Sequence, residues 1–396
     1  MAMFHHDGRN YEEAASAAAA RARVKLEGML DLGRGRLGTM IDRIQNEQPR
    51  DMVVSSKQLT FGTGQYEIEG DEPGIVSGLT IRVGMDHQAG LHSNALGQVA
   101  GRLGIPLKYI NELENVSKPW SARLLAHNLN ELNSHGSSER FLLREVNGEV
   151  RGFLSDRYRR MDSGPILESF AEACGRVNAV PVDSHASDTK WYLKMLLPQV
   201  YEPVPNEVCS FGVVLQNSDF GDGKLSVRVF MLRLWCTNYA IREEALSQVH
   251  LGRRLTQDIA WSDKTCELDT SAMASSVFDI VSQTLSPERV NRELGLVKLA
   301  NDEGIDAGKS LTALERQKLI SKAEGKEIAE IYNTPDVEIL PPGNTVWRLS
   351  NALSALAGKR RDDGDERRAR ELEEHAGTVL TRLETKHNLA RVRAQA

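Results

Sequence analysis

The chain has 396 residues, of which 40% are hydrophobic and 26% charged, and its formal net charge is −6 at pH 7. This composition is ordinary for a soluble globular protein of one or two domains, and it excludes a uniformly basic nucleic-acid binder but not a local basic groove. The sequence has neither an apolar run of about 18 residues nor the plan of a signal peptide, so we expect no membrane span and a cytoplasmic location. The four cysteines lack metal-ligand spacing and are expected to be reduced and mostly buried: Cys174, Cys209, Cys236 and Cys266.

The first 50 residues are rich in Ala, Arg and Gly. Residues 11–32 contain strong helix formers and predict a helix, which the Gly-Arg-Gly-Arg segment at 33–36 should end. We therefore expect residues 1–50 to form a poorly packed helical or flexible arm. Its arginines would be solvated or would contact an anionic partner: Arg21, Arg23, Arg34 and Arg36.

Residues 51–262 have the mixed pattern of an α+β core domain. Asn147-Gly148 between apolar runs at 140–146 and 149–155 is a strong signal for a type I′ hairpin. A second hairpin is expected from runs at 208–215 and 225–236, which flank a polar loop. Further strands are expected within 53–68 and over 189–197. Helices are expected over 89–103, where Gly104 would cap the end, and over 109–113, 119–133 and 165–177.

Residues 263–396 read as a helical region. Helices are expected over 271–284, from 286, from 311, over 345–356 and over 367–392. The last helix carries apolar residues on one edge, which could pack on the chain itself or mediate oligomer contact: Leu372, Val379, Leu380 and Leu383. The fold class predicted is thus α+β, an antiparallel β-sheet with hairpins and flanking helices followed by a mostly helical C-terminal region.

Enzyme signatures are sparse. Hydrolase and phosphate-loop motifs are absent, and the Gly-Lys-Ser at 308–310 lacks a preceding strand, which indicates a helix-to-helix turn. Asp86, His87 and His92 could begin a metal site, but no third ligand is fixed and a polar turn is favoured. Three acids could hold Mg²⁺ in an enzyme acting on DNA, although turn chemistry is commoner: Asp156, Asp219 and Asp222. We expect no catalytic residue, no metal and no cofactor.

A basic turn follows the predicted strand 149–155. Arg157, Arg159 and Arg160 surround Tyr158, and guanidinium groups beside a stackable ring suit a nucleic-acid backbone and bases. An internal network between Asp156 and these arginines is an equally favoured alternative.

Other basic residues gather around the second hairpin. Arg228 and Arg233 should lie on opposite faces of its second strand, and Trp235 is a further candidate stacking residue. Asn238 is expected to cap a helix that begins near Ile241. A second basic cluster contains Arg242, His250, Arg253 and Arg254.

Several segments resemble the phage- and plasmid-borne family known as domain of unknown function 932. They run in order over about 85–396: LGQVAGRLGIPLKYI (96–110), FLSDRYRRMD (153–162), VVLQNSDFGDGKLSV (213–227), LRLWCTNYAI (232–241), HLGRR (250–254), TVWRLSNALSALA (345–357) and LEEHAG (372–377). The chain departs from the family at Tyr239, where a glycine usually follows Cys-Thr-Asn. The resemblance implies mobile-element DNA biology in a bacterial host and no established chemistry.

The leading expectation is a non-catalytic nucleic-acid-binding protein of a phage or plasmid, which binds single-stranded DNA in recombination or replication. The predicted hairpins and helix around a curved sheet are similar to those of strand-annealing recombination proteins, an analogy of fold only. The alternatives are a metal-dependent enzyme acting on DNA and a structural protein that assembles through its C-terminal helices. A homo-oligomer is a possible partner state, and no membrane partner is expected.

Overall fold

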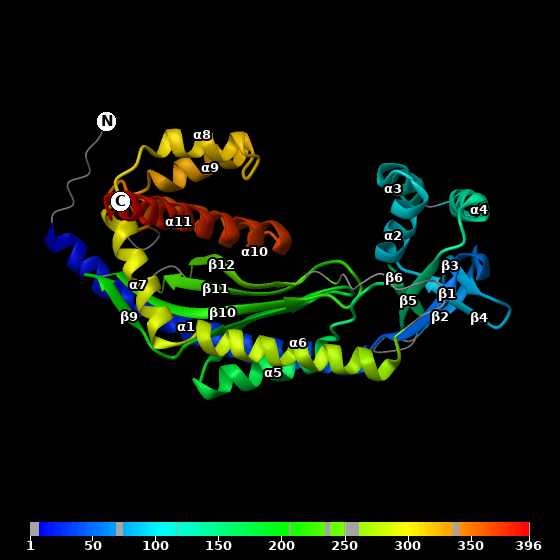
Figure 1. Ribbon diagram of the computed structural model, residues 1–396. Coiled ribbons are helices and arrows are strands. Elements are labelled where there is room, and N and C mark those ends of the chain that lie inside the picture. The colour runs from blue at the N-terminus through cyan, green and yellow to red at the C-terminus, as the bar shows by residue number, and fades with distance from the viewer. Residues whose placement is uncertain are drawn as a thin grey trace.

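The computed structural model describes residues 8–68, 74–116, 118–205, 207–233, 238–248, 250, 261–335 and 340–395. Within these residues, two mostly antiparallel sheets of six strands each are followed by a helical C-terminal region (Figure 1). The predicted α+β class is therefore confirmed. The strands of both sheets fall between Arg50 and Gln248, although residues 51–262 were expected to hold one sheet, and the proposed domain boundaries stay a prediction.

The first sheet along the chain, called the small sheet below, has the strand order β1-β5-β6-β4-β3-β2. Among its described pairs, only β4–β6 is parallel. Its strands are β1 (Arg50–Ser55), β2 (Leu59–Ile68), β3 (Gly74–Val83), β4 (His87–Leu91), β5 (Arg140–Val146) and β6 (Glu149–Ser155), with the short 3₁₀ helix η1 (Ser56–Gln58) before β2. Its helices are α2 (Ser93–Leu103), α3 (Leu107–Val116) and α4 (Pro119–His135). Helices and sheet share one apolar core, which includes Phe61, Ile81, Val99, Leu129 and Phe153.

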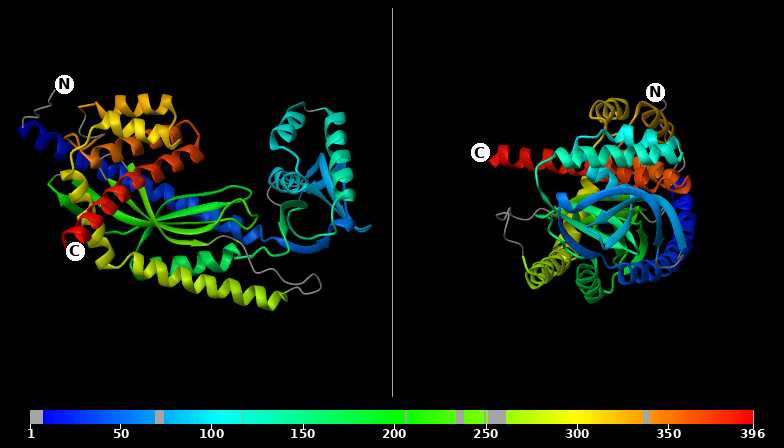
Figure 2. Two further views of the ribbon diagram at one scale, coloured as in Figure 1. Left: turned by 45° about the horizontal axis from the view of Figure 1, so that its top comes forward. Right: turned by 90° about the vertical axis from the view of Figure 1, so that its right-hand side faces the viewer.

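The second sheet, called the large sheet below, has the strand order β12-β11-β10-β8-β7, with β9 paired to β10. Its strands are β7 (Val180–Ala186), β8 (Trp191–Leu196), β9 (Tyr201–Val204), β10 (Glu207–Asn217), β11 (Leu225–Arg233) and β12 (Asn238–Gln248). The helices α5 (Ser163–Arg176) and α6 (Asp263–Thr284) lie on one side of this sheet, and the last two helices lie on the other (Figures 1 and 2).

The C-terminal region continues with α7 (Pro287–Asp302), α8 (Ala307–Arg316), α9 (Lys322–Tyr332), α10 (Val346–Asp362) and α11 (Glu366–Gln395). Leu372 and Leu380 of α11 are fully buried and Val379 is partly buried, whereas the side chain of Leu383 lies outside the described residues. The apolar edge of α11 therefore packs within its own chain, on α10 and β12. Gly-Lys-Ser 308–310 lies in the first turn of α8, as the helix-turn interpretation requires. No helix in the described part of the chain combines the length and apolarity that crossing a membrane would require.

Two local predictions are confirmed by backbone geometry. Asn147 and Gly148 both have positive φ, 51° and 80°, as a type I′ turn demands, and the flanking strands have the expected bounds. Gly104 ends α2 in the left-handed conformation, with φ 72°. Here short-range sequence chemistry is sufficient because each turn is specified by the residues within it.

The N-terminal helix expected over 11–32 is present, but its expected end at 33–36 is wrong. A single helix, α1 (Gly8–Asn46), runs through the Gly-Arg-Gly-Arg segment and packs along β7. A Cβ on Gly33 would lie 2.6 Å from the Pro181 carbonyl oxygen, so this glycine permits close approach of the helix to the strand instead of ending the helix. Met40, farther along α1, is 2% exposed and belongs to the core that α5 shares with the large sheet. Arg34 and Arg36 pair with Asp31 and Asp183, and the side chains of Arg21 and Arg23 lie outside the described residues.

The helix expected after Asn238 is also wrong. Residues 238–248 form β12, in which Tyr239, Ala240 and Ile241 pair with Leu232, Met231 and Phe230 of β11. Pairing with the edge of a sheet satisfies the backbone of this segment and buries Ala240 and Ile241. That long-range gain outweighs the preference of Asn238 for a helix cap.

Candidate functional site

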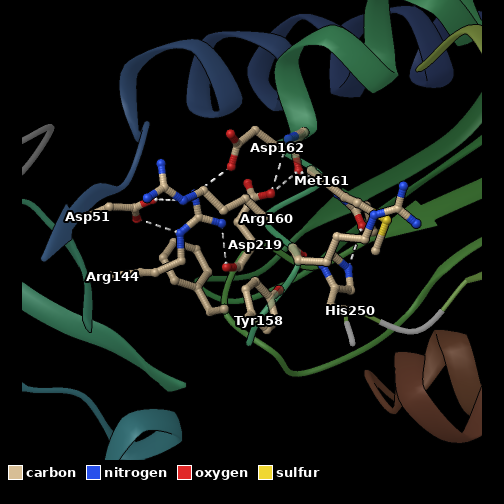
Figure 3. Close-up of polar contacts among 12 residues, drawn as sticks. Asp51, Arg144, Tyr158, Arg160, Met161, Asp162, Asp219 and His250 are labelled. Carbon is tan, nitrogen blue, oxygen red and sulfur yellow. Dashed lines mark hydrogen bonds and ion pairs between the residues drawn. The ribbon is translucent and has the colours of Figure 1, made fainter. Parts of the chain in front are cut away.

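The two sheets meet at a group of charged residues around Arg144, which we call the inter-sheet cluster: Asp51, Arg144, Arg160, Asp162 and Asp219 (Figure 3). The Arg144 side chain is only 2% exposed. Its Nε donates to Asp51 Oδ1 at 2.8 Å, its Nη1 donates to the Asp219 carbonyl at 2.9 Å, and its Nη2 pairs with Asp162. One guanidinium therefore joins β1, the start of α5 and the β10–β11 loop.

The sequence brings these groups together through strand register. Asp51 of β1 stands opposite Arg144 of β5 in the antiparallel ladder. Asp162 directly precedes α5, and the Asp219 carboxylate accepts hydrogen bonds from the Ser163 backbone N–H at 3.1 Å and from Ser163 Oγ at 2.9 Å. Burial raises the pKa of Asp219 to about 6, against the lowering influence of Arg144. The arrangement holds the small sheet against the loop of the large one.

Tyr158 and His250 extend the cluster. Their rings stack with centroids 4.8 Å apart and planes 8° apart, and the Tyr158 hydroxyl donates to the Ser218 carbonyl at 3.0 Å. Burial raises the pKa of Tyr158 and lowers that of His250 to about 4, although the His250 ring nitrogens face the Arg159 carbonyl at 2.7 Å and Asn217 Oδ1 at 3.1 Å. One face of the Tyr158 ring is thus covered by His250, and its hydroxyl is already bonded.

The neighbouring arginines of the predicted basic turn are paired with acids of other elements. Arg159 forms a two-pronged ion pair with Asp269 of α6, at 2.5 and 2.6 Å. Arg160 contacts Asp51 at 2.8 Å and Asp263 at 3.1 Å. Arg157 is exposed, and its side chain has no hydrogen bond or ion pair with the described residues. Of the three candidate arginines in this turn, the structure leaves Arg157 open to a partner.

The basic residues of the second hairpin also serve internal contacts. The Arg233 guanidinium is buried and bonds to both Glu207 carboxylate oxygens, at 2.8 and 3.0 Å. Arg228 pairs with Glu374 of α11. The remaining candidates cannot be placed, because the Arg242 side chain and residues Trp235, Arg253 and Arg254 lie outside the described residues.

The candidate metal ligands are dispersed or engaged. Asp222 accepts a hydrogen bond from Thr189 Oγ1 at 2.7 Å and pairs with Lys190 at 3.2 Å. Asp219 accepts a hydrogen bond from Ser163 Oγ. Among the described residues, no three His, Cys, Asp or Glu side chains gather closely enough to hold a metal ion. The metal-dependent alternative built on Asp156, Asp219 and Asp222 therefore has no ligand set in this part of the chain.

The two histidines that precede α2 have structural partners as well. His87 Nε2 lies 2.5 Å from Glu145 Oε2. His92 caps α2 by accepting from the Asn94 N–H at 3.2 Å. The polar-turn interpretation of this segment is supported.

The structure reveals a basic surface that the sequence interpretation missed, which we call the α8–α9 surface. It consists of the exposed cations Arg316, Lys318 and Lys322, and two adjoining hollows of about 780 and 710 Å³ lie beside them. None of the three has an ion pair with the described residues. Glu324 lines the same hollow, but it forms an ion pair with Arg368 at 2.7 Å. A signal existed, since residues 316–323 contain three cations and no acid.

Comparisons of the chain with protein-family models, curated proteins and solved structures found no match. The resemblance to the domain of unknown function 932 family stays a prediction from the sequence motifs.

Proposed function

We propose that this protein binds nucleic acid through the α8–α9 surface and carries out no chemistry on it. The observation that supports the proposal is the gathering of Arg316, Lys318 and Lys322 without acidic partners among the described residues. Three like charges within seven residues repel one another. A polyanion such as a phosphate backbone would neutralise them and release its counterions.

The charge balance around these residues supports a local positive field in a protein of net charge −6. Glu324 is tied to Arg368, and Lys309 at the edge of the same surface is paired with Asp306 at 3.3 Å. Glu315 is the partly buried acid of this lining. The three unpaired cations therefore outnumber the free acid that faces the same hollows.

The proposed ligand is single-stranded DNA, in the recombination or replication of a phage or plasmid within the bacterial cytoplasm. One observation supports binding without cleavage or modification of the nucleic acid. Asp219 and Asp222, two of the three candidate metal ligands, are engaged in hydrogen bonds that hold loops together. Assembly through the apolar edge of α11 is not supported, because that edge is buried within the chain. A homo-oligomer formed through another surface stays a prediction.

The test is a fluorescence-anisotropy titration of labelled DNA and RNA at several salt concentrations, with a Mg²⁺ incubation to monitor cleavage. The variant Arg316→Gln, Lys318→Gln, Lys322→Gln should reduce the log-affinity versus log-salt slope by about 0.7 for each phosphate left without its cation, or about 2 in total. The control Arg34→Gln, Lys264→Gln, Lys298→Gln removes equal charge from exposed sites on α1, α6 and α7 and should bind like the wild type. Absence of wild-type binding, magnesium-dependent cleavage, or an unchanged slope in the first variant would overturn the proposal.

A further inference from the structure

The strand β2 lies at one edge of the small sheet, and among the described residues no further strand pairs with it on that side. It pairs with β3 in an unbroken register, from Leu59 opposite Val83 to Ile68 opposite Gly74. An edge strand presents a row of backbone N–H and C=O groups with which another extended chain can pair. What covers this edge therefore decides whether β2 is open to a partner.

Helix α4 covers the edge at Phe61. The Phe61 N–H donates to Asn130 Oδ1 at 2.8 Å, and Asn130 Nδ2 donates to the Phe61 carbonyl at 2.7 Å. Both backbone groups of Phe61 thus point away from β3. Because this direction recurs at every second residue of an antiparallel strand, Thr63 and Gln65 also turn both backbone groups toward the edge.

The turn of the β5–β6 hairpin covers the other end of β2. A Cβ on Gly148 would lie 2.1 Å from the Glu67 carbonyl oxygen, so this turn rests directly on the strand. Between the two covered ends, no hydrogen bond to the Thr63 and Gln65 backbone groups at this edge is found among the described residues. Two donors and two acceptors are therefore open, in the spacing of a β-ladder.

A hollow of about 600 Å³ lies beside this open stretch of β2. Its floor is the β2–β3 ribbon, where Thr63 stands opposite Leu79 and Gln65 opposite Ser77. Its walls come from the end of α3 and the start of α4, and include the apolar residues Leu113, Ala122 and Leu125. Its volume and mixed lining fall within the range of ligand sites, so it can take up side chains of a chain bound at the edge.

The charges of the hollow favour an acidic occupant. Lys118 and Arg123 belong to its lining, are exposed, and have no ion pair with the described residues. Glu114 is the one acid among the described lining residues, and burial raises the pKa of its carboxyl. Cations therefore outnumber acids here in a chain of net charge −6, and the N-terminal end of α4 adds to the positive field.

We infer that the open stretch of β2 and the adjoining hollow, which we call the edge groove, bind an extended acidic segment of a partner protein as an added strand. The backbone of the segment pairs with Thr63 and Gln65, an apolar side chain enters the hollow, and a carboxylate contacts Lys118 and Arg123. An extended polypeptide carries donors and acceptors at the same spacing as β2, so it satisfies all four open groups at once. The inference goes beyond nucleic-acid binding and does not depend on it.

The first experiment selects peptides from a displayed random library on the immobilised full chain. Peptides of about nine residues span the open stretch, since a strand advances about 3.3 Å per residue. The enriched sequences should place apolar and acidic residues two positions apart, because side chains at that spacing face the same side of a strand. A labelled synthetic peptide of the most enriched sequence is then titrated with the protein.

Methylation of single peptide nitrogens tests the strand geometry without altering the protein. In an added strand, alternate N–H groups point toward β2 and the others toward solvent. Methylation of a nitrogen that faces β2 should lower the affinity by at least about tenfold, because it removes a hydrogen bond and pushes the strands apart. Methylation of the next nitrogen along should change the affinity by less than about twofold, because that group stays in solvent.

Protein variants test the two parts of the edge groove. Thr63→Pro removes an N–H that points away from β3, so it should abolish peptide binding and keep the melting temperature, as proline is tolerated on the open side of an edge strand. Lys118→Gln, Arg123→Gln should weaken binding by about 3- to 10-fold at low salt and by less at high salt. The control Lys57→Gln, Lys108→Gln removes the same charge from exposed sites near the small sheet and should bind like the wild type.

The inference is wrong if the wild type selects no peptide above the level obtained on a blank surface, or if the enriched peptides lack acidic residues. Equal losses from methylation at neighbouring nitrogens, or unchanged affinity in the Lys118→Gln, Arg123→Gln variant, would overturn it too. Displacement of the bound peptide by oligo(dT) would assign the edge groove to nucleic acid instead. If Thr63→Pro fails to fold, the methylated peptides still decide between strand addition and another mode of binding.

Discussion

Two basic segments of this chain look alike in sequence and differ in the fold. The turn at 157–160 and the α8–α9 surface at 316–322 each hold three cations within a few residues. In the turn, Arg159 and Arg160 are paired with acids from β1 and α6. On the α8–α9 surface the cations face solvent without such partners among the described residues. Tertiary packing brings acidic residues to one basic segment and not to the other. These acids thus decide whether the cations are paired within the fold or left open to a partner.

The comparison has an energetic side. A buried charge stabilises the fold only through its partners, and removing one partner leaves the others desolvated and unpaired. Removing an exposed cation changes the free energy of unfolding little. Stability measurements should therefore separate the two regions more sharply than any sequence pattern does.

The largest effect is expected at Arg144. Arg144→Ala should lower the free energy of unfolding by about 3 kcal/mol, because it removes the buried cation that Asp51 and Asp162 share and leaves Asp51 with Arg160 alone. Chemical denaturation measures this loss. Arg82→Ala, which removes an exposed arginine bonded to Gln88, should stay within about 0.5 kcal/mol of the wild type. A loss below about 1 kcal/mol for Arg144→Ala would mean that the two sheets are held together by other contacts.

The next effect is a pair of opposing pH dependences in the same region. Burial raises the pKa of Asp219 from 3.8 to about 6, so between these values the folded state holds a proton that the unfolded chain has lost, and stability falls as pH rises. Burial lowers the pKa of His250 from 6.5 to about 4, so the unfolded chain holds the extra proton and stability rises with pH. Between pH 4 and 6 the two slopes offset each other.

Single variants should uncover each slope. Asp219→Asn should leave stability rising by about 3 kcal/mol from pH 4 to 6.5, and His250→Gln should leave it falling by a similar amount from pH 4 to 6. Denaturation midpoints across this range, read against the wild type, measure both. Parallel pH profiles for the wild type and the two variants would show that neither group titrates as its burial requires.

A smaller difference is expected between Arg159 and Arg316. Arg159→Ala removes a partly exposed ion pair with Asp269 and should cost about 1 kcal/mol without changing DNA affinity. Arg316→Ala should leave stability within about 0.5 kcal/mol and weaken DNA binding. Thermal melts and anisotropy on the same samples provide both readings. The reverse pattern would return the phosphate-contacting role to the turn.

Local features of the fold were predictable from the sequence, and long-range ones were not. Asn147-Gly148 specifies its own hairpin, and Gly104 its own helix end. Gly33 was misread because the closeness of α1 to Pro181 depends on a strand about 150 residues away. Asn238 was misread because β11 offers residues 238–248 a partner edge.

The internal ion pairs of the candidate site residues could not be predicted for the same reason. The sequence near 157–160 does not predict that Asp51, Asp263 and Asp269 pair with two of the arginines there. The α8–α9 surface could have been found from its acid-free run at 316–323.

Hydrogen exchange with mass spectrometry tests the central claim most directly, because it maps binding without altering the protein. Backbone amides are compared with and without an oligo(dT) of about 20 nucleotides, longer than common single-strand site sizes. The account predicts slower exchange at 307–332, which covers α8 and α9, and no change at 153–162. Protection at 153–162 with none at 307–332 would contradict it.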